Sequence, residues 1–200
     1  MKNDYKMYKP DKKIIKIGIL LTALIGIISF IPILIRNNGL YVAYNDYYNQ
    51  YVPFIKELRR IILSGNLSWS WNSFLGDSFI RAYSYYTVFN PFAWFLAFFP
   101  NNLLLYATLL ITIIKLIISM ISSLYFFRLF CKKDQYALIG SIIYTFSGFT
   151  IINSDFYFFL DVIAVFPFLM YGLELLIREK KYSLYIFAIS INACINLYFF

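Results

Sequence analysis

The chain has 200 residues, of which 61% are hydrophobic, 22% aromatic and only 14% charged, with a net charge of +8. Soluble domains average about 45–50% apolar and about 25% charged residues. The composition therefore excludes a soluble enzyme domain, a disordered tail, a collagen-like rod and a secreted disulfide scaffold, and it predicts an all-α, polytopic membrane protein. Without histidine, and with only two distant cysteines, the sequence predicts no metal site and no disulfide.

Five apolar runs are long enough to cross a bilayer, which takes about 20 helical residues. The first, residues 14–35, follows a basic tail at 1–13 and exceeds the apolar region of a signal peptide, so we interpret it as an uncleaved anchor. The others are residues 102–127, 136–152, 158–177 and 182–200. The last run ends at Phe200 without a polar tail, so we expect the sequence to be a fragment whose C-terminal part is missing.

The positive residues indicate an orientation for these spans. Twelve of the 18 lysines and arginines fall on the side of the N-terminal tail, five fall in the loop 36–101, and Lys115 falls within a span. Cytoplasmic loops carry the excess of Lys and Arg, so we expect a bacterial cell-membrane protein with a cytoplasmic N-terminus and the long loop outside. The charge then requires no nucleic acid partner.

The loop 36–101 contains two further apolar segments. Residues 51–64 repeat apolar side chains at helical spacing, which predicts an amphipathic helix lying on the outer leaflet. Arg59 and Arg60 would then lie at headgroup level, either as anchors or as ligands of a lipid phosphate. Residues 89–100 are too short to span and carry a proline near each end, which predicts a re-entrant or interfacial segment.

Several loop residues are suited to chemistry, each with a plainer interpretation. Asp46 is the first acid of the loop and fits either a helix cap or a general base at the membrane surface; the local pattern favours the cap. Trp71 and Asp77 fit either a sugar-stacking site or an aromatic belt at the membrane interface. A turn near Asn90 would bring this amide towards Asp46.

Lys115 lies in the middle of an apolar run, where a charge costs about 2.5–3.5 kcal/mol on the insertion scale. It therefore needs a partner. Asp161 is one candidate, and an anionic substrate is an equal alternative. Glu174 and Arg178 are spaced for an ordinary helical ion pair.

The order of several short motifs resembles the bacterial YfhO-like membrane proteins, from about residue 18 to the end. In chain order the motifs are Asn45-Asp46-x-x-x-Gln50-Tyr51-x-Pro53-Phe54, Trp71-x-x-x-Leu75-Gly76, Asn90-Pro91-Phe92, Tyr144-x-Phe146-Ser147-Gly148-Phe149, Phe159-Leu160-Asp161 and Asn196-Leu197-Tyr198-Phe199. A lysine-bearing helix lies between the third and the fourth of them.

The resemblance implies a GT-C-type glycosyltransferase that moves a sugar from a polyprenyl-phosphate carrier to an envelope acceptor such as teichoic acid or another glycan. It makes Asp46 the general base, reversing the preference for a cap, and places Gln50 and Tyr51 beside it. Arg59, Arg60 and Lys115 become candidates for binding the carrier phosphate, while Trp71, Asp77, Asn90 and Asp161 complete the predicted substrate site. The family leaves dependence on a divalent metal open.

Two other functions fit the same sequence. A transporter or flippase-like protein for a lipid-linked glycan would depend on Lys115 more than on Asp46. A structural assembly protein is the third interpretation, and no GxxxG-dominated packing helix supports it.

Overall fold

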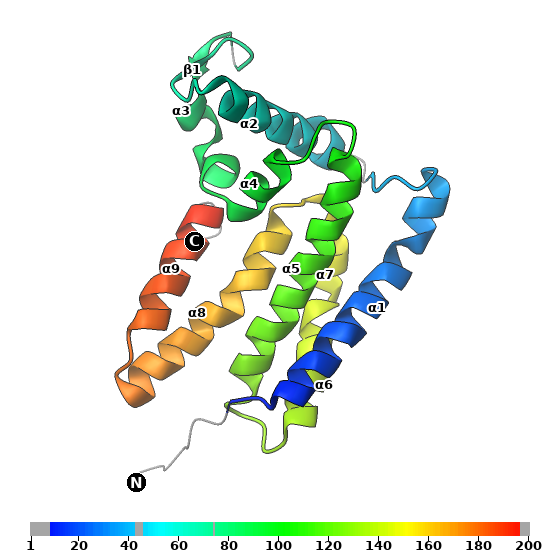
Figure 1. The fold of residues 1–200 in the computed structure, drawn as a ribbon. Coiled ribbons are helices and arrows are strands. Elements are labelled where there is room, and N and C mark those ends of the chain that lie inside the picture. The colour runs from blue at the N-terminus through cyan, green and yellow to red at the C-terminus, as the bar shows by residue number, and fades with distance from the viewer. Residues whose placement is uncertain (1–8, 43–45, 74, 197–200) are drawn as a thin grey trace.

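The computed structural model describes residues 9–42, 46–73 and 75–196, and within them the chain is mostly helical, with one short pair of strands. Figure 1 shows a bundle of long helices, with the segment between residues 36 and 104 packed over one end of the bundle. The bundle contains α1 (Lys12–Arg36), α5 (Leu104–Phe127), α6 (Asp134–Thr145), α7 (Gly148–Ile152), the 3-10 turn η3 (Asn153–Asp155), α8 (Phe159–Glu179) and α9 (Ser183–Ile195).

Four helices are long and apolar enough to cross a membrane: α1, α5, the stretch Asp134–Ile152 formed by α6 and α7, and α8. The protein is therefore a multi-pass membrane protein. Helix α9 is apolar but shorter, and the predicted fifth span runs on into residues 197–200, which lie outside the described residues, as does Asn45 of the first motif. The predicted span at 136–152 is interrupted, because α6 ends at Thr145 and Ser147 caps α7 by accepting a hydrogen bond from the Thr150 amide.

Helix α1 packs on α5 through three small buried residues spaced four apart, Gly18, Thr22 and Gly26. A Cβ on Gly18 would lie 2.7 Å from Met120 Sδ, and one on Gly26 would lie 2.9 Å from Ile113 Cδ1. Small residues let membrane helices approach closely. The sequence has no GxxxG motif here, but threonine between two glycines forms a comparable stripe of small residues.

Helix α8 contains Pro167, which has no amide hydrogen to donate to the carbonyl of Ile163 four residues earlier. The Tyr144 hydroxyl donates to that carbonyl at 3.1 Å, and Ser122 Oγ donates to the neighbouring carbonyl of Ala164 at 2.8 Å. Within a membrane, freed backbone groups need such partners. Side chains of α5 and α6 thus donate hydrogen bonds to the two carbonyl groups of α8 that lie one turn before the proline.

We call residues 37–103 the loop segment. Its elements are the π-helix η1 (Tyr47–Tyr51), α2 (Val52–Ser64), the paired strands β1 (Trp69–Ser70) and β2 (Asp77–Ser78), α3 (Phe79–Tyr83), the π-helix η2 (Ser84–Val88) and α4 (Pro91–Ala97). The strands are antiparallel, with Trp69 opposite Ser78 and Ser70 opposite Asp77. In Figure 1 the hairpin lies on the side of α2 opposite the membrane-spanning helices.

The amphipathic helix forms nearly where the sequence predicts it, but its apolar face does not lie on lipid. Ile55, Leu58 and Ile61 are at most 1% exposed although no bilayer surrounds the protein, because they pack in one core with α4 and the start of α5. Gly65 ends the helix in a left-handed conformation, with φ of 69°. The periodicity identified the apolar face correctly, but protein and not lipid covers it; the position of the helix at the outer leaflet stays a prediction.

Candidate functional site

The loop segment meets the bundle in a buried junction around the first half of α5. Leu104, Ala107 and Ile111 of α5 share a core with Tyr41, Ile55 and other loop-segment residues. Lys115 follows one turn later and is 1% exposed. It therefore lies beneath the loop segment, and not isolated among apolar helices as its place in the sequence suggests.

Lys115 is paired with Asp161 at the start of α8. Lys115 Nζ lies 2.5 Å from Asp161 Oδ1, and both side chains are at most 1% exposed. The ammonium also donates to the Tyr157 carbonyl at 3.2 Å and lies 3.3 Å from the centre of the Tyr157 ring. Of the two partners considered for Lys115, the structure supplies Asp161.

Asn90 joins this ion pair to the loop segment. Its Nδ2 donates to Asp161 Oδ2 at 2.6 Å, while its Oδ1 accepts the amides of Phe92 and Ala93 at 2.9 and 3.3 Å. Asn90 is thus the N-cap of α4, and Pro91 at the first helical position has no amide hydrogen to satisfy. One amide group therefore connects α4, α8 and, through Asp161, α5. Among the described residues, the carboxylate that its amide group meets is that of Asp161 and not that of Asp46.

A cluster of three tyrosines lies beside the ion pair, and two of them, Tyr51 and Tyr157, face the Lys115 ammonium. The Tyr51 and Tyr157 ring centres are 4.4 Å apart, and Tyr47 lies beside both. The Tyr47 hydroxyl bonds to Thr108 Oγ1, and the Tyr157 hydroxyl donates to the Thr108 carbonyl at 3.0 Å. The Tyr51 hydroxyl is buried without a hydrogen-bond partner in the described part of the chain, and burial raises the pKa of this phenol well above its ordinary value.

Asp46 lies one residue before this tyrosine cluster. It is exposed and immediately precedes η1, whose first residue, Tyr47, is fully buried. Its side chain makes no capping hydrogen bond, so the helix-cap interpretation finds no support. Gln50 is half-buried on the same turn. The buried ring of Tyr47 thus fixes the backbone from which a solvent-facing carboxylate projects.

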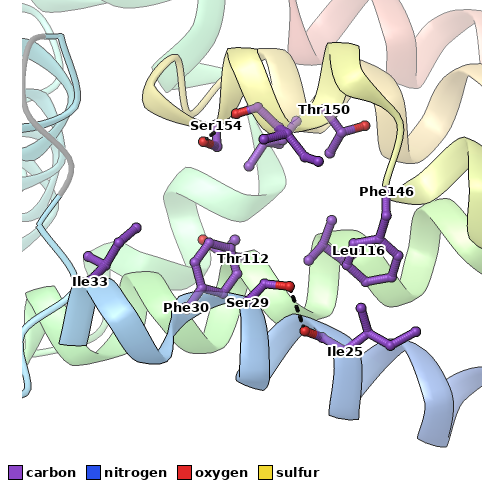
Figure 2. Close-up of a pocket in the computed structure, with 11 residues that line it drawn as sticks. Ile25, Ser29, Phe30, Ile33, Thr112, Leu116, Phe146, Thr150 and Ser154 are labelled. Carbon is purple, nitrogen blue, oxygen red and sulfur yellow. Dashed lines mark hydrogen bonds between the residues drawn. The ribbon is translucent and has the colours of Figure 1, made fainter. Parts of the chain in front are cut away.

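A cleft of about 280 Å³ lies between α1, α5 and α7. Figure 2 shows side chains from these helices around it. Its lining is apolar except for four hydroxyl groups, and the residues are Ile25, Ser29, Phe30, Ile33, Thr112, Leu116, Phe146, Thr150, Ile151, Ser154 and Leu160. Two of them adjoin the ion pair in sequence, Leu116 next to Lys115 and Leu160 next to Asp161. Sequence reasoning missed this cleft, because apolar side chains at a cleft and in a core follow the same pattern.

Arg59 and Arg60 are held in different ways. Arg59 Nη1 donates to the carbonyls of Ala97 and Phe98 at the end of α4, at 2.9 and 3.2 Å. Carbonyl groups bind the guanidinium without neutralising its charge. Arg60, by contrast, forms a two-point pair with Glu57, at 2.9 and 2.6 Å.

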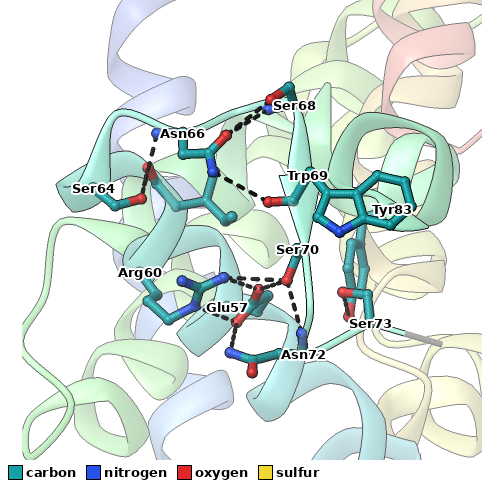
Figure 3. Close-up of polar contacts among 11 residues, drawn as sticks. Glu57, Arg60, Ser64, Asn66, Ser68, Trp69, Ser70, Asn72, Ser73 and Tyr83 are labelled. Carbon is teal, nitrogen blue, oxygen red and sulfur yellow. Dashed lines mark hydrogen bonds and ion pairs between the residues drawn. The ribbon is translucent and has the colours of Figure 1, made fainter. Parts of the chain in front are cut away.

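The Glu57–Arg60 pair also holds the hairpin, as Figure 3 shows. Ser70 Oγ donates to Glu57 Oε1 at 2.5 Å, Arg60 Nη2 donates to Ser70 Oγ at 3.1 Å, and Asn72 Nδ2 donates to Glu57 Oε2 at 3.3 Å. We call these four residues the hairpin clamp. The Arg60 hydrogen bonds, with those of Ser70 and Asn72, lower the pKa of Glu57 to about 2.

The other two predicted site residues, Trp71 and Asp77, belong to the hairpin. Trp71 is 78% exposed, and Asp77 is half-buried, its carboxylate accepting the Ser78 amide at 2.7 Å. Figure 1 places the hairpin across α2 from the junction. The structure thus brings together Tyr51, Asn90, Lys115 and Asp161, and it leaves Trp71 and Asp77 in a separate region.

Tyr157 and Thr108 complete the junction, and sequence reasoning missed both. Tyr157 lies four residues before Asp161, so the pairing of Asp161 with Lys115 would have indicated that Tyr157 also lies near Lys115. Thr108 gives no such signal, because a threonine in an apolar run is an ordinary residue of a membrane helix. Within the described ranges, no three His, Cys, Asp or Glu side chains are grouped closely enough to hold a metal ion.

Comparison with known proteins gives one match. The family described as bacterial membrane protein YfhO matches residues 18–200. No curated protein and no solved structure matches the chain.

Proposed function

The chain belongs to the YfhO family of bacterial membrane proteins, and on that premise we propose that it is a glycosyltransferase. It moves a sugar from a polyprenyl-phosphate carrier to an envelope glycan such as teichoic acid. In this proposal the N-terminus is cytoplasmic and the loop segment lies outside the cell, as the distribution of positive residues indicates. Asp46 is the general base.

The placement of Asp46 carries the proposal. An acceptor polymer reaches the protein from water, so a base that serves it must face solvent, and Asp46 is exposed. A base must also be held still. Tyr47, buried next to Asp46 and bonded to Thr108 of α5, provides that support.

The proposed reaction is one displacement at the anomeric carbon of the donor sugar. The Asp46 carboxylate takes the proton of an acceptor hydroxyl, and the hydroxyl oxygen forms a bond to the anomeric carbon. The bond between that carbon and the carrier's phosphate oxygen breaks, and its electron pair leaves with the phosphate.

The leaving phosphate gains negative charge, which a fixed cation stabilises. Of the three predicted cations, Lys115 and Arg60 are paired with carboxylates, whereas the partners of Arg59 at the end of α4 are carbonyl oxygens. We therefore assign Arg59 to the phosphate. Lys115, Asp161 and Asn90 hold the loop segment on the bundle, and Gln50 stands beside Asp46.

The cleft between α1, α5 and α7 suits the isoprenoid part of the carrier. Its lining is almost wholly apolar, and it lies among helices that cross the membrane. The transporter alternative depends on Lys115 more than on Asp46, and the pairing of Lys115 with Asp161 leads us to prefer the glycosyltransferase.

The test is transfer of radiolabelled sugar from polyprenyl-phosphate donors to envelope polymers, in membranes containing equal amounts of the wild-type protein or a variant. General bases contribute about 10²–10⁴-fold, so we expect Asp46→Asn to lower transfer at least about 100-fold. Asn49→Ala, at an exposed polar residue of the same turn, serves as the matched control and should retain activity. Normal transfer by Asp46→Asn, or none by the wild-type protein, would overturn the proposal.

A further inference from the structure

The hairpin presents large apolar side chains to water. Trp71 is 78% exposed, Leu75 99% and Trp69 43%. Scattered exposed apolar residues are ordinary, but three on one short turn form a patch that requires an explanation.

The turn is built to hold this patch outward. Leu75 and Gly76 both have positive φ, 66° and 105°, a conformation that costs a leucine energy. A Cβ on Gly76 would lie 2.8 Å from the Trp71 ring, so the glycine backbone packs directly against that indole. Trp69 meets Trp71 edge to face, with ring centres 5.6 Å apart. One side of Trp71 is thus backed by protein, and its large exposed fraction leaves the other side open.

The base of the hairpin is rigid as well. Ser70 is 1% exposed and bound to Glu57 and Arg60 of α2, and Ser73 donates to the Tyr83 hydroxyl at 3.1 Å. Two aromatic rings are therefore carried on a fixed support, and binding a ligand would not require this support to become ordered.

The position of the hairpin argues against lipid as its ligand. In Figure 1 it lies on the side of α2 opposite the membrane-spanning helices, which favours a position in water over the aromatic belt that its composition alone suggests. Its size argues against a protein partner, because two indoles bury about 150–250 Å² each, whereas a stable protein interface buries about 800 Å² per partner.

The surroundings match a neutral, hydroxyl-rich ligand. The exposed polar neighbours of the two tryptophans are Asn66, Ser68 and Asn72, which are amides and a hydroxyl. Of the charged groups of the hairpin and its base, Glu57 and Arg60 neutralise each other, and the half-buried Asp77 carboxylate accepts the Ser78 amide at 2.7 Å. A carboxylate in the hairpin disfavours an anionic ligand. The C–H groups of a pyranose ring carry partial positive charge and pack on the negative face of an aromatic ring, while its hydroxyls donate to side-chain amide oxygens. The oxygens of Asn66 and Asn72 are the candidates for this, because their Nδ2 groups already donate to the Trp69 carbonyl and to Glu57.

We propose that the hairpin is a binding platform for a pyranose-containing glycan, in which Trp71 stacks on one sugar ring and Trp69 supports Trp71. The inference rests on the proposed function, because that function supplies a glycan on this side of the membrane. It makes the hairpin the site that retains a pyranose-containing acceptor glycan, rather than the anionic polyol-phosphate backbone of a teichoic acid, and it keeps this site separate from the chemistry at Asp46.

The experiment measures tryptophan emission of the full protein in lipid vesicles, in a Trp94→Phe background so that only Trp69 and Trp71 emit. The probes are a neutral glucan and a chitin oligosaccharide. We expect at least one of them to change the emission saturably. Trp71→Phe should weaken binding a few-fold and Trp71→Ala at least tenfold, whereas Ile80→Ala, at a residue that is 44% exposed on α3, should leave it unchanged. Because Trp71→Phe and Trp71→Ala both remove an emitter, the affinities of these two variants are measured by calorimetry.

The same titration with Asp46→Asn separates the two proposals. Saturable binding by that variant supports the platform even if the wild-type protein transfers no sugar. Asp46-dependent transfer with unchanged acceptor KM in Trp71→Ala would overturn the platform and leave the proposed function intact. Equal affinity of Trp71→Ala and wild type, no binding of either probe, or quenching of the hairpin emission by brominated lipids would also overturn it.

Discussion

Two polar clusters of similar chemistry lie on opposite sides of α2. The junction cluster joins Lys115, Asp161 and Asn90 without access to water, whereas the hairpin clamp joins Arg60, Glu57 and Asn72 at the surface, with Arg60 46% exposed. Each cluster contains a cation, a carboxylate and an amide. Because the junction cluster is buried and the hairpin clamp is partly exposed, we expect the junction cluster to contribute more to the stability of the fold, and the clamp to hold only the hairpin in place.

The comparison predicts the largest loss of stability when one partner of the buried Lys115–Asp161 pair is removed. Lys115→Met leaves Asp161 buried without its cation, which should lower the free energy of unfolding by about 3–5 kcal/mol. The double variant Lys115→Met/Asp161→Asn retains a partner for Asn90 and should recover most of that loss. Thermal denaturation in detergent, followed by circular dichroism, measures both. Equal losses in the single and double variants would show that the pair is not the source of the effect.

A smaller loss should follow from Asn90→Ala. The variant removes the cap of α4, worth about 0.5–2 kcal/mol, and a hydrogen bond to a charged group, worth about 1.5–3 kcal/mol. Asn90→Asp retains a capping oxygen but places a second carboxylate beside Asp161. We therefore expect its unfolding temperature to fall as well, and to recover partly when Asp161→Asn is added. Unchanged stability of Asn90→Ala would remove this residue from the junction.

The smallest effect is expected at the hairpin clamp, where Glu57→Gln should cost about 1 kcal/mol or less at neutral pH. Because the pKa of Glu57 is lowered from 4.5 to about 2, the clamp contributes fully above about pH 4.5 and is lost as the pH falls towards 2. Tryptophan emission of the Trp94→Phe protein should report this loosening. In Glu57→Gln the emission should be insensitive to pH over the same range; an identical acid transition in both proteins would contradict the assignment.

The sequence predicted what depends on local pattern. The helical spacing from Tyr51 to Ser64 identified α2, and the long apolar runs identified α1, α5 and α8. It could not predict what covers α2, because the same periodicity describes a helix on lipid and a helix under protein.

The sequence likewise identified some residues of the candidate site but not how they are paired. The cost of a lysine in an apolar run identified Lys115 as a residue that needs a partner, but two partners satisfied that need equally. Asn90 was predicted to turn towards Asp46, whereas its amide lies on Asp161, because the cap of α4 fixes its direction. The exposure of Asp46 depends on the burial of Tyr47, a long-range contact with Thr108 that no local pattern encodes.

The proline of α8 has a consequence for biogenesis. The donors that satisfy the carbonyls of Ile163 and Ala164, Tyr144 and Ser122, both precede α8 in the chain. During synthesis, α5 and α6 therefore emerge from the ribosome before the segment that needs them. The hydrogen-bond donors are therefore already present when α8 enters the bilayer, so its carbonyl groups need not remain without partners. In a circular permutant that began at α8, the donors would be made after the carbonyl groups that need them.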